Sequence, residues 1–314
     1  METPRRRYQT LDTLRGVTIV SMILYHACWD LVWIFGADWP WYRSDGAYLW
    51  QQSICWTFIL LSGYCWSLGR HRLRRGLMAF GGGALVSAVT LLAPIPRPRQ
   101  DVICLGINYK AHAEEAERYS SEAFKKERPI PIYFSKRVTE AVGPEGFIES
   151  HPGLVERLDY EAELAVIIGK TAKNVKAADA ADYIFGYTVL NDVSARLLQT
   201  THKQWYFGKG LDGFTPIGPC ITTADEIAFP PALRISSRVN REPRQDSTTD
   251  LLITSIADII EELSSGMTLL PGTIIATGTP AGVGMGFDPP KFLKPGDVVE
   301  CAVEGIGTLR NTVR

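Results

Sequence analysis

The stretch Leu158–Ser194, LDYEAELAVIIGKTAKNVKAADAADYIFGYTVLNDVS, contains two apolar runs that are typical of buried strands. Glu161 and Glu163 stand at the start of the first run, and Asp192 follows the second. Because side chains two residues apart lie on the same face of a strand, the two glutamates point the same way. Carboxylates at buried positions are costly unless something neutralises them. This stretch therefore predicts a β-rich fold that brings acidic side chains together at strand ends.

These three carboxylates form a candidate metal site. The stretch has no neighbouring His or Cys, and ligands that are all oxygen suit a hard cation such as Mg²⁺ or Mn²⁺, with Ca²⁺ as a further alternative. The remaining coordination positions are then left to water or substrate. A solvated strand end with ordinary surface acids is the alternative interpretation that a bare E-x-E leaves open.

Five further motifs surround this stretch. They are GINYKAHAEE (106–115), IYFSK (132–136), QWYFGKGLDGFTPIGP (204–219), VNREPRQDSTTD (239–250) and TGTPAGVG (277–284). In this order and with these spacings, residues 102–314 resemble the fumarylacetoacetate hydrolase family. The resemblance implies a mostly β domain, a rolled mixed β-sheet with short helices, that forms a homodimer. It also implies that Glu161, Glu163 and Asp192 bind Mg²⁺.

His112 and Glu115 stand three residues apart, so they are neighbours if this part of the chain is helical. A carboxylate beside an imidazole fixes its tautomer and raises its basicity, which suits a group that takes a proton from water. An ordinary surface pair on a helix is the plain alternative. The family resemblance favours the catalytic interpretation, because in many members this pair activates water and closes over the substrate. Glu114, the adjacent acid, is expected to point elsewhere.

Further segments supply candidates for substrate contact. Lys209 lies between two glycines, so the backbone there can approach a ligand closely, and its ammonium group can balance the carboxylates and polarise a substrate oxygen. Gly278 and Thr279 belong to a glycine-rich turn whose N–H groups form a nest suited to a carboxylate. This turn lacks the spacing of a phosphate-binding P-loop. The resemblance adds Gln245 as a residue that contacts substrate.

The first hundred residues differ in composition from the rest of the chain. They carry 11 Arg, no Lys and 5 acids, a net charge of +6, whereas the remainder has a net charge of −7. Seven of the eight tryptophans fall before residue 67. We therefore predict a hydrophobic helical segment at 1–93, a Pro- and Arg-rich linker at 94–101 and a catalytic domain at 102–314.

Three stretches of the first segment, 17–35, 48–68 and 77–92, carry few or no charges and contain 19, 21 and 16 residues. The first two are long enough to cross a hydrocarbon core as helices, and the third is marginal. Arginine clusters flank the first stretch and follow the second, which places both on the cytoplasmic side. We therefore expect association with a membrane through residues 17–92, with buried helices of a soluble protein as the alternative. The catalytic domain itself is expected to be of the cytoplasmic type.

The sequence LDTLRGVTIVSMILYHACWDL at 11–31 resembles the opening of bacterial membrane acyltransferases of the heparan-α-glucosaminide N-acetyltransferase type. His26 lies at the position of a membrane histidine that is associated with acyl transfer in those enzymes, and Asp30 follows four residues later. Because the segment has only two or three spans and that family has many more, we interpret it as a truncated start that does not catalyse by itself.

Together these residues predict an Mg²⁺-dependent hydrolase of C–C bonds in acylpyruvate-type 2-oxo acids. The resemblance implies a metal-stabilised enolate and a water molecule activated by His112 and Glu115. A decarboxylase or isomerase of the same family, acting on oxaloacetate or on 2-hydroxyhepta-2,4-diene-1,7-dioate, is the alternative among enzymes. A membrane-anchored, non-catalytic fusion is the alternative from another class. Nucleic acid is not expected as a partner, because the basic runs are short and lack interleaved aromatic residues.

Overall fold

The computed structural model of the chain describes residues 92–116 and 130–314, together with twelve separate positions between residues 13 and 54. The chain divides into two compact units, Met1–Val89 and Thr90–Arg314. All twelve positions of the first unit have helical backbone, and the Trp50 indole donates a hydrogen bond to the Ser21 hydroxyl over 2.9 Å.

Most residues of the expected membrane-crossing stretches, 17–35, 48–68 and 77–92, lie outside the described residues, as does the His26–Asp30 pair. They therefore remain predictions. Among the residues that the structure describes, no helix is both long enough and apolar enough to span a bilayer.

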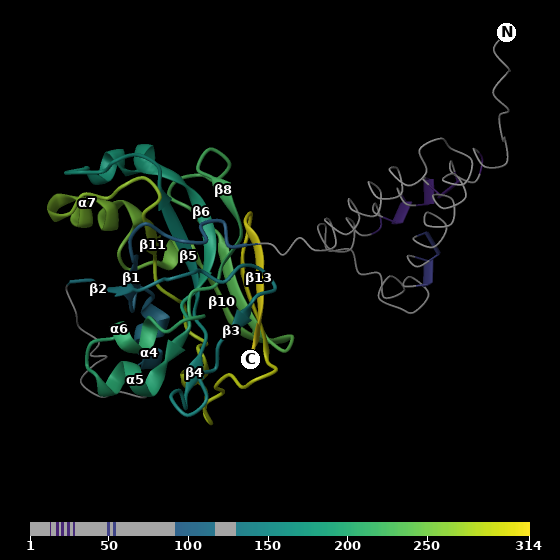
Figure 1. Cartoon of the computed structure of the whole chain (residues 1–314). Coiled ribbons are helices and arrows are strands. Elements are labelled where there is room, and N and C mark those ends of the chain that lie inside the picture. Colours follow the sequence, from purple (N-terminus) through teal and green to yellow (C-terminus); the bar gives the residue numbers. More distant parts are fainter. Residues whose placement is uncertain are drawn as a thin grey trace, which may run out of the picture. The chain divides into compact units, whose positions relative to one another are not determined.

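The second unit is built on two β-sheets (Figure 1). The larger sheet has six strands in the order β2-β1-β11-β5-β6-β8, and only the β1–β11 pair is parallel, so the sheet is mixed. Its strands are β1 (Val102–Gly106), β2 (Ile132–Lys136), β5 (Ala162–Ile168), β6 (Ile184–Asn191), β8 (Ile217–Thr223) and β11 (Ile274–Ala276).

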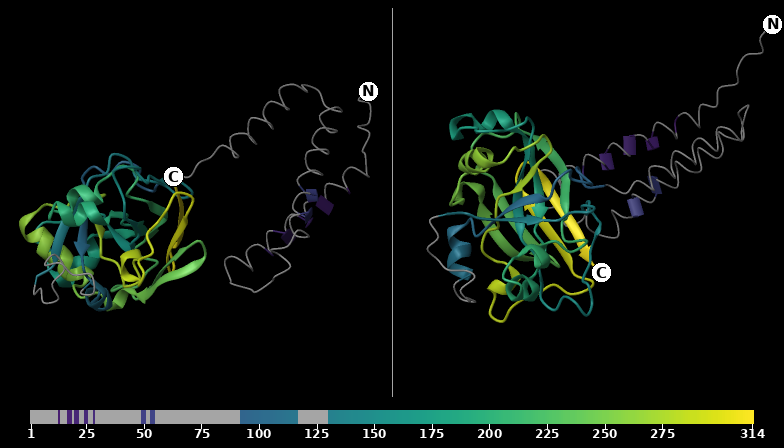
Figure 2. Two further views of the ribbon diagram at one scale, coloured as in Figure 1. Left: turned by 90° about the horizontal axis from the view of Figure 1, so that it is seen from below. Right: turned by 60° about the vertical axis from the view of Figure 1, so that its left-hand side comes forward.

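The second sheet has five strands in the order β10-β9-β12-β13-β3. These are β3 (Phe147–Ile148), β9 (Arg234–Val239), β10 (Glu242–Thr248), β12 (Val298–Val303) and β13 (Gly307–Val313). β4 (Leu158–Asp159) and β7 (Ser194–Ala195) form a short antiparallel pair. In the sequence β4 directly precedes β5, and β7 directly follows β6. Figure 2 shows the C-terminal strands, in yellow, on the side of this unit away from the helix α7 (Ile256–Gly266).

The run Leu164–Ile168 of β5 is apolar at every position, and the packing of the strand gives the reason. Leu164 and Val166 lie in the main core, which also contains Val299 and Leu309 of the second sheet. Ala165, on the opposite face, lies in a second apolar cluster with residues of β1 and β11. A strand that is covered on both faces requires a continuous apolar run and not an alternating one.

Three short helices lie together beside the ends of these strands (Figure 1). They are α4 (Lys110–Ala116), α5 (Arg196–Thr201) and α6 (Tyr206–Lys209). α4 follows β1, whereas α5 and α6 follow β6 and β7, so segments that are distant in the sequence meet at one place. The expected mixed β-sheet domain with few short helices is therefore present.

Shortening one buried side chain of β5 tests the packing of the core. We expect Leu164→Ala, at a residue with 0% exposure, to lower the free energy of unfolding by about 2–5 kcal/mol, because it leaves a cavity between the sheets. Leu251→Ala, at a residue with 58% exposure, is the matched control and should change the free energy by less than about 0.5 kcal/mol. Denaturant unfolding of both variants provides the comparison, and equal losses would contradict the central position of β5.

Candidate active site

The three predicted carboxylates meet where β5 begins and β6 ends. Ala162 pairs with Asn191, so Glu161 lies beside Asp192, whose N–H donates to the Glu161 carbonyl over 2.8 Å. Glu163, two residues along β5, points to the same place. Carboxylate oxygens of Glu161, Glu163 and Asp192 lie within 4.8 Å of one another, and all three residues are buried. The antiparallel register thus brings together acids that stand about thirty residues apart in the sequence.

Two lysines neutralise part of this cluster. The Lys209 ammonium group lies 2.6 Å from Glu161 Oε2 and 2.7 Å from Asp192 Oδ2. Lys136 Nζ lies 2.6 Å from Asp192 Oδ1 and also donates to the carbonyl of Lys209 over 2.6 Å. Lys209 therefore takes the charge-balancing place that the sequence predicted, whereas the sequence did not predict a role for Lys136.

Arg196, at the start of α5, adds a third buried cation. Its Nη1 lies 2.6 Å from Glu161 Oε1, and its Nε lies 2.8 Å from Asp159 Oδ2. Lys209 and Arg196 lower the pKa of Glu161, although burial opposes them. The cluster thus holds four acids, including Asp159 and Glu163, against three bases.

Glu163 carries the excess negative charge of the cluster. It accepts the N–H of Gly278 over 2.9 Å but forms no ion pair with any residue that the structure describes. Burial raises the pKa of Glu163 well above its usual value, and the neighbouring charges of Asp192 and Glu161 raise it further. An additional cation at this point would relieve that repulsion.

The three carboxylates fit a hard divalent cation. They offer only oxygen ligands, they are close together, and the cluster to which they belong, four acids with Asp159 against three bases, is one positive charge short of neutral. Carboxylate oxygens that accept a bond from Lys209 or Arg196 keep a second lone pair for a metal. Glu161, Glu163 and Asp192 are therefore the residues that would hold it.

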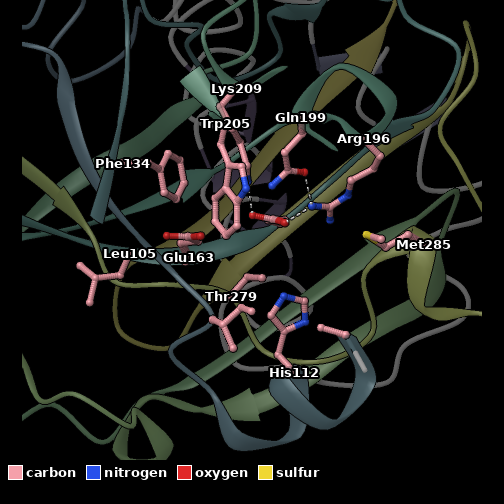
Figure 3. Close-up of a pocket in the computed structure, with 14 residues that line it drawn as sticks. Leu105, His112, Phe134, Glu163, Arg196, Gln199, Trp205, Lys209, Thr279 and Met285 are labelled. Atoms are coloured by element: carbon pink, nitrogen blue, oxygen red, sulfur yellow. Dashed lines mark hydrogen bonds and ion pairs between the residues drawn. The ribbon is translucent and has the colours of Figure 1, made fainter. Parts of the chain in front are cut away.

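His112 and Glu115 lie next to each other on α4, at a distance of 3.0 Å between Nδ1 and Oε2. Both residues are 8% exposed, and His112 lines a pocket that also contains Glu161, Glu163 and Lys209 (Figure 3). A carboxylate at Nδ1 makes this nitrogen the donor and leaves Nε2 with a free lone pair, as in a general base. Glu114 is exposed, as expected for the residue that does not take part.

The glycine-rich turn at 277–284 forms hydrogen bonds with other residues of the same chain. The N–H of Gly278 is bonded to Glu163, so this donor does not face a ligand in the described structure. The Thr279 hydroxyl donates to the Ala162 carbonyl over 2.9 Å, and Thr279 lines the pocket. One N–H of the turn that was expected to bind a substrate carboxylate thus holds Glu163, a candidate metal ligand.

Gln245 forms hydrogen bonds to the framework around the pocket. Its Oε1 accepts the N–H of Ala162 over 3.0 Å, and its Nε2 donates to Thr279 Oγ1 over 2.7 Å and to the Pro280 carbonyl over 2.8 Å. Gln245 is not among the residues that line the described pocket. The amide of Gln245 thus joins β5 to the turn, and the substrate contact that the resemblance implied stays a prediction.

Several residues of the pocket were not predicted from the sequence. Arg196 and Gln199 line it from α5, and the buried Nη2 of Arg196 has no hydrogen-bond partner among the described residues. Their spacing of three residues, shortly after Asp192, is the signal that would have indicated a common helix face. The other missed lining residues are mostly apolar: Leu105, Gly106, Ile107, Ala116, Phe134, Trp205 and Met285. A Cβ at Gly106 would lie 2.3 Å from the Trp205 ring, so the lack of a side chain at this position leaves room for the indole that lines the pocket.

Residues 101–314 match the family model described as the C-terminal domain of fumarylacetoacetate (FAA) hydrolase. Residues 7–108 match the model described as the catalytic part of heparan-alpha-glucosaminide N-acetyltransferase. Both resemblances seen in the motifs are therefore confirmed.

Characterised relatives support the first match. The chain is 46% identical over 228 residues to oxaloacetate tautomerase YisK of Bacillus subtilis, a similarity that covers 73% of this chain and 74% of that protein. The solved fumarylacetoacetate hydrolase of Exiguobacterium antarcticum has a TM-score of 0.64 and 45% identity, covering 71% of this chain and 77% of that one. The 2-hydroxyhepta-2,4-diene-1,7-dioate isomerase of Mycobacterium marinum has a TM-score of 0.60 and 40% identity, covering 73% and 79%.

The effect of the Glu163 carboxylate on the stability of the fold can be tested without substrate. Because the pKa of Glu163 is higher in the folded than in the unfolded chain, its proton stabilises the fold at low pH, and that stabilisation is lost as the pH rises through the folded-state pKa. At pH 8 in EDTA, Glu163→Gln should therefore unfold at a higher temperature than the native chain, because it removes a buried carboxylate that has no basic partner among the described residues.

Addition of Mg²⁺ should raise the unfolding temperature of the native chain but not that of Glu163→Gln. Glu156→Gln, which removes an exposed carboxylate, serves as the control and should respond like the native chain. An equal response to Mg²⁺ in Glu163→Gln would remove Glu163 from the metal site.

Proposed function

The chain belongs to the fumarylacetoacetate hydrolase family, and on that premise we propose that it catalyses the keto–enol tautomerisation of a small 2-oxo dicarboxylic acid such as oxaloacetate. One observation carries the proposal. Of the titratable groups that line the described pocket, His112 alone lies outside the network of carboxylates and cations. Tautomerisation moves one proton between C3 and the 2-oxygen, and a single base that takes and returns it is sufficient. The name of the Bacillus relative supports the same reaction.

The chain's own groups divide the work as follows. Glu115 holds the Nδ1–H of His112, and Nε2 takes the proton from C3 and delivers it to the 2-oxygen, with the reverse transfer in the opposite direction. Lys209 and Arg196 provide positive charge for the substrate oxygens, and the unpaired Nη2 of Arg196 is assigned to a substrate carboxylate. Apolar walls, including Phe134 and Trp205, limit the water around the reacting atoms.

We assign Mg²⁺ to Glu161, Glu163 and Asp192, with Mn²⁺ or Ca²⁺ as alternatives. When bound there, a divalent cation would act as a Lewis acid that polarises the 2-oxo group and favours loss of the C3 proton. The buried all-oxygen cluster and its excess negative charge support this assignment.

Hydrolysis of a C–C bond in an acylpyruvate is the second candidate. The contact between His112 and Glu115 favours it, because the same oriented imidazole can activate water. Hydrolysis also requires a second group that protonates the departing carbon, and the described pocket offers no titratable group for this outside the charged cluster. For this reason we place tautomerisation first. A homodimer of the catalytic domain remains a proposal from the family.

Variants of α4 test the reaction. We expect His112→Ala to lower kcat for oxaloacetate tautomerisation by about 10²–10⁴-fold, the usual contribution of general base catalysis, with little change in KM. Glu115→Gln should give a smaller loss, since it weakens only the orientation and basicity of the imidazole. Glu114→Gln is the neighbouring control and should retain full activity.

The decay of enol absorbance measures tautomerisation, and an acylpyruvate assay with the same variants measures C–C hydrolysis. Native activity on the acylpyruvate alone, lost in His112→Ala, would favour the second candidate. Full tautomerase activity in His112→Ala would contradict both mechanisms.

We further propose that residues 1–93 attach the chain to a membrane. The lengths of the three apolar stretches and the match of residues 7–108 to a membrane acyltransferase model support this proposal. The full chain should therefore sediment with membranes, and the unit Thr90–Arg314 expressed alone should remain in the supernatant. Recovery of the full chain in the supernatant without detergent would contradict the proposal.

A further inference from the structure

One residue, Gly282, connects the segment that precedes Glu161 to the helix that carries His112. Tyr160 directly precedes Glu161 and has 0% exposure. Its hydroxyl donates a hydrogen bond of 2.9 Å to the carbonyl of Gly282. The N–H of the same Gly282 donates a hydrogen bond of 3.0 Å to Oε1 of Glu115. Glu115 thus holds His112 with one oxygen and Gly282 with the other.

The backbone around Gly282 is closely confined. Its φ of +102° is a conformation that residues with a side chain rarely adopt, and a Cβ there would lie 2.1 Å from the carbonyl oxygen of Arg244. Asp159 fixes the next part of the turn, because its carboxylate accepts the N–H of Gly284 over 2.7 Å and that of Met285 over 3.0 Å. The Tyr160 hydroxyl binds the carbonyl of Gly282 and Glu115 binds its N–H, so this residue is held on both sides of its Cα.

We propose that Tyr160 is a positioning residue for His112, acting through Gly282 and Glu115. The Tyr160 hydroxyl fixes the Gly282 residue, the Gly282 N–H fixes the Glu115 carboxylate, and the carboxylate fixes the imidazole ring. Tyr160 does not line the described pocket, and its hydroxyl proton is directed at a carbonyl, so it does not contact substrate. This inference rests on the proposed role of His112 as the base.

Kinetics of the full chain test the connection. Tyr160→Phe keeps the ring and removes only the donor, so kcat for tautomerisation should fall by about 3- to 10-fold, the usual contribution of one hydrogen bond, with KM unchanged. In a Glu115→Ala background, Tyr160→Phe should cause no further loss. Replacement of Tyr160 by p-aminophenylalanine, which restores a donor at the same place, should recover the activity.

Tyr187→Phe is the matched control, because Tyr187 is buried in β6 with 1% exposure. It should leave kcat unchanged. Native-like kcat in Tyr160→Phe, or the same loss with and without Glu115, would overturn the proposal.

A second measurement does not depend on any substrate. With ¹⁵N-labelled histidine, the His112 resonances can be assigned through His112→Ala, and Nδ1 reports its bond to Glu115. Tyr160→Phe should shift this resonance towards its position in Glu115→Ala, and Tyr187→Phe should not. An unchanged resonance in Tyr160→Phe overturns the proposal. If the variants show these shifts but the native chain has no tautomerase activity, only the proposed function is overturned.

Discussion

The structure depends on the ion pairs among the buried acids and bases at the ends of β5 and β6. Charges removed from water cost several kcal/mol each unless they are paired with good geometry. Lys136 of β2, Arg196 of α5 and Lys209 of α6 reach the same cluster of carboxylates. Because the loss of any of these partners would leave a buried charge unpaired, the cluster holds α5 and α6 against the larger sheet, to which β2 belongs.

The same constraint gives the site its chemistry. The pairs that hold α5 and α6 also present Lys209 and Arg196 to the pocket, and they leave Glu163 as the carboxylate without a cation. The proposed cation position and the positive groups proposed for a substrate anion therefore belong to one arrangement. His112, the proposed base, comes from a separate element, α4, and its partner Glu115 is bonded to Gly282.

The two parts of the chain have separate compositions and separate family matches. The boundary between the compact units lies at residues 89 and 90, and the two family models overlap only at residues 101–108. The arginine-rich, tryptophan-rich segment and the domain built around the acidic cluster are thus distinct in composition and in family match.

Local spacing in the sequence determined the alternation of Glu161 and Glu163, the neighbourhood of His112 and Glu115, and the β-rich character of residues 102–314, since each depends on the period of a single element. Spacing could not indicate that Lys136 pairs with Asp192, that Gln245 serves the framework, or that Tyr160 reaches Gly282. These contacts join residues 34 to 122 positions apart. They follow from strand register and from the packing of helices onto the sheet, and only the tertiary structure decides these.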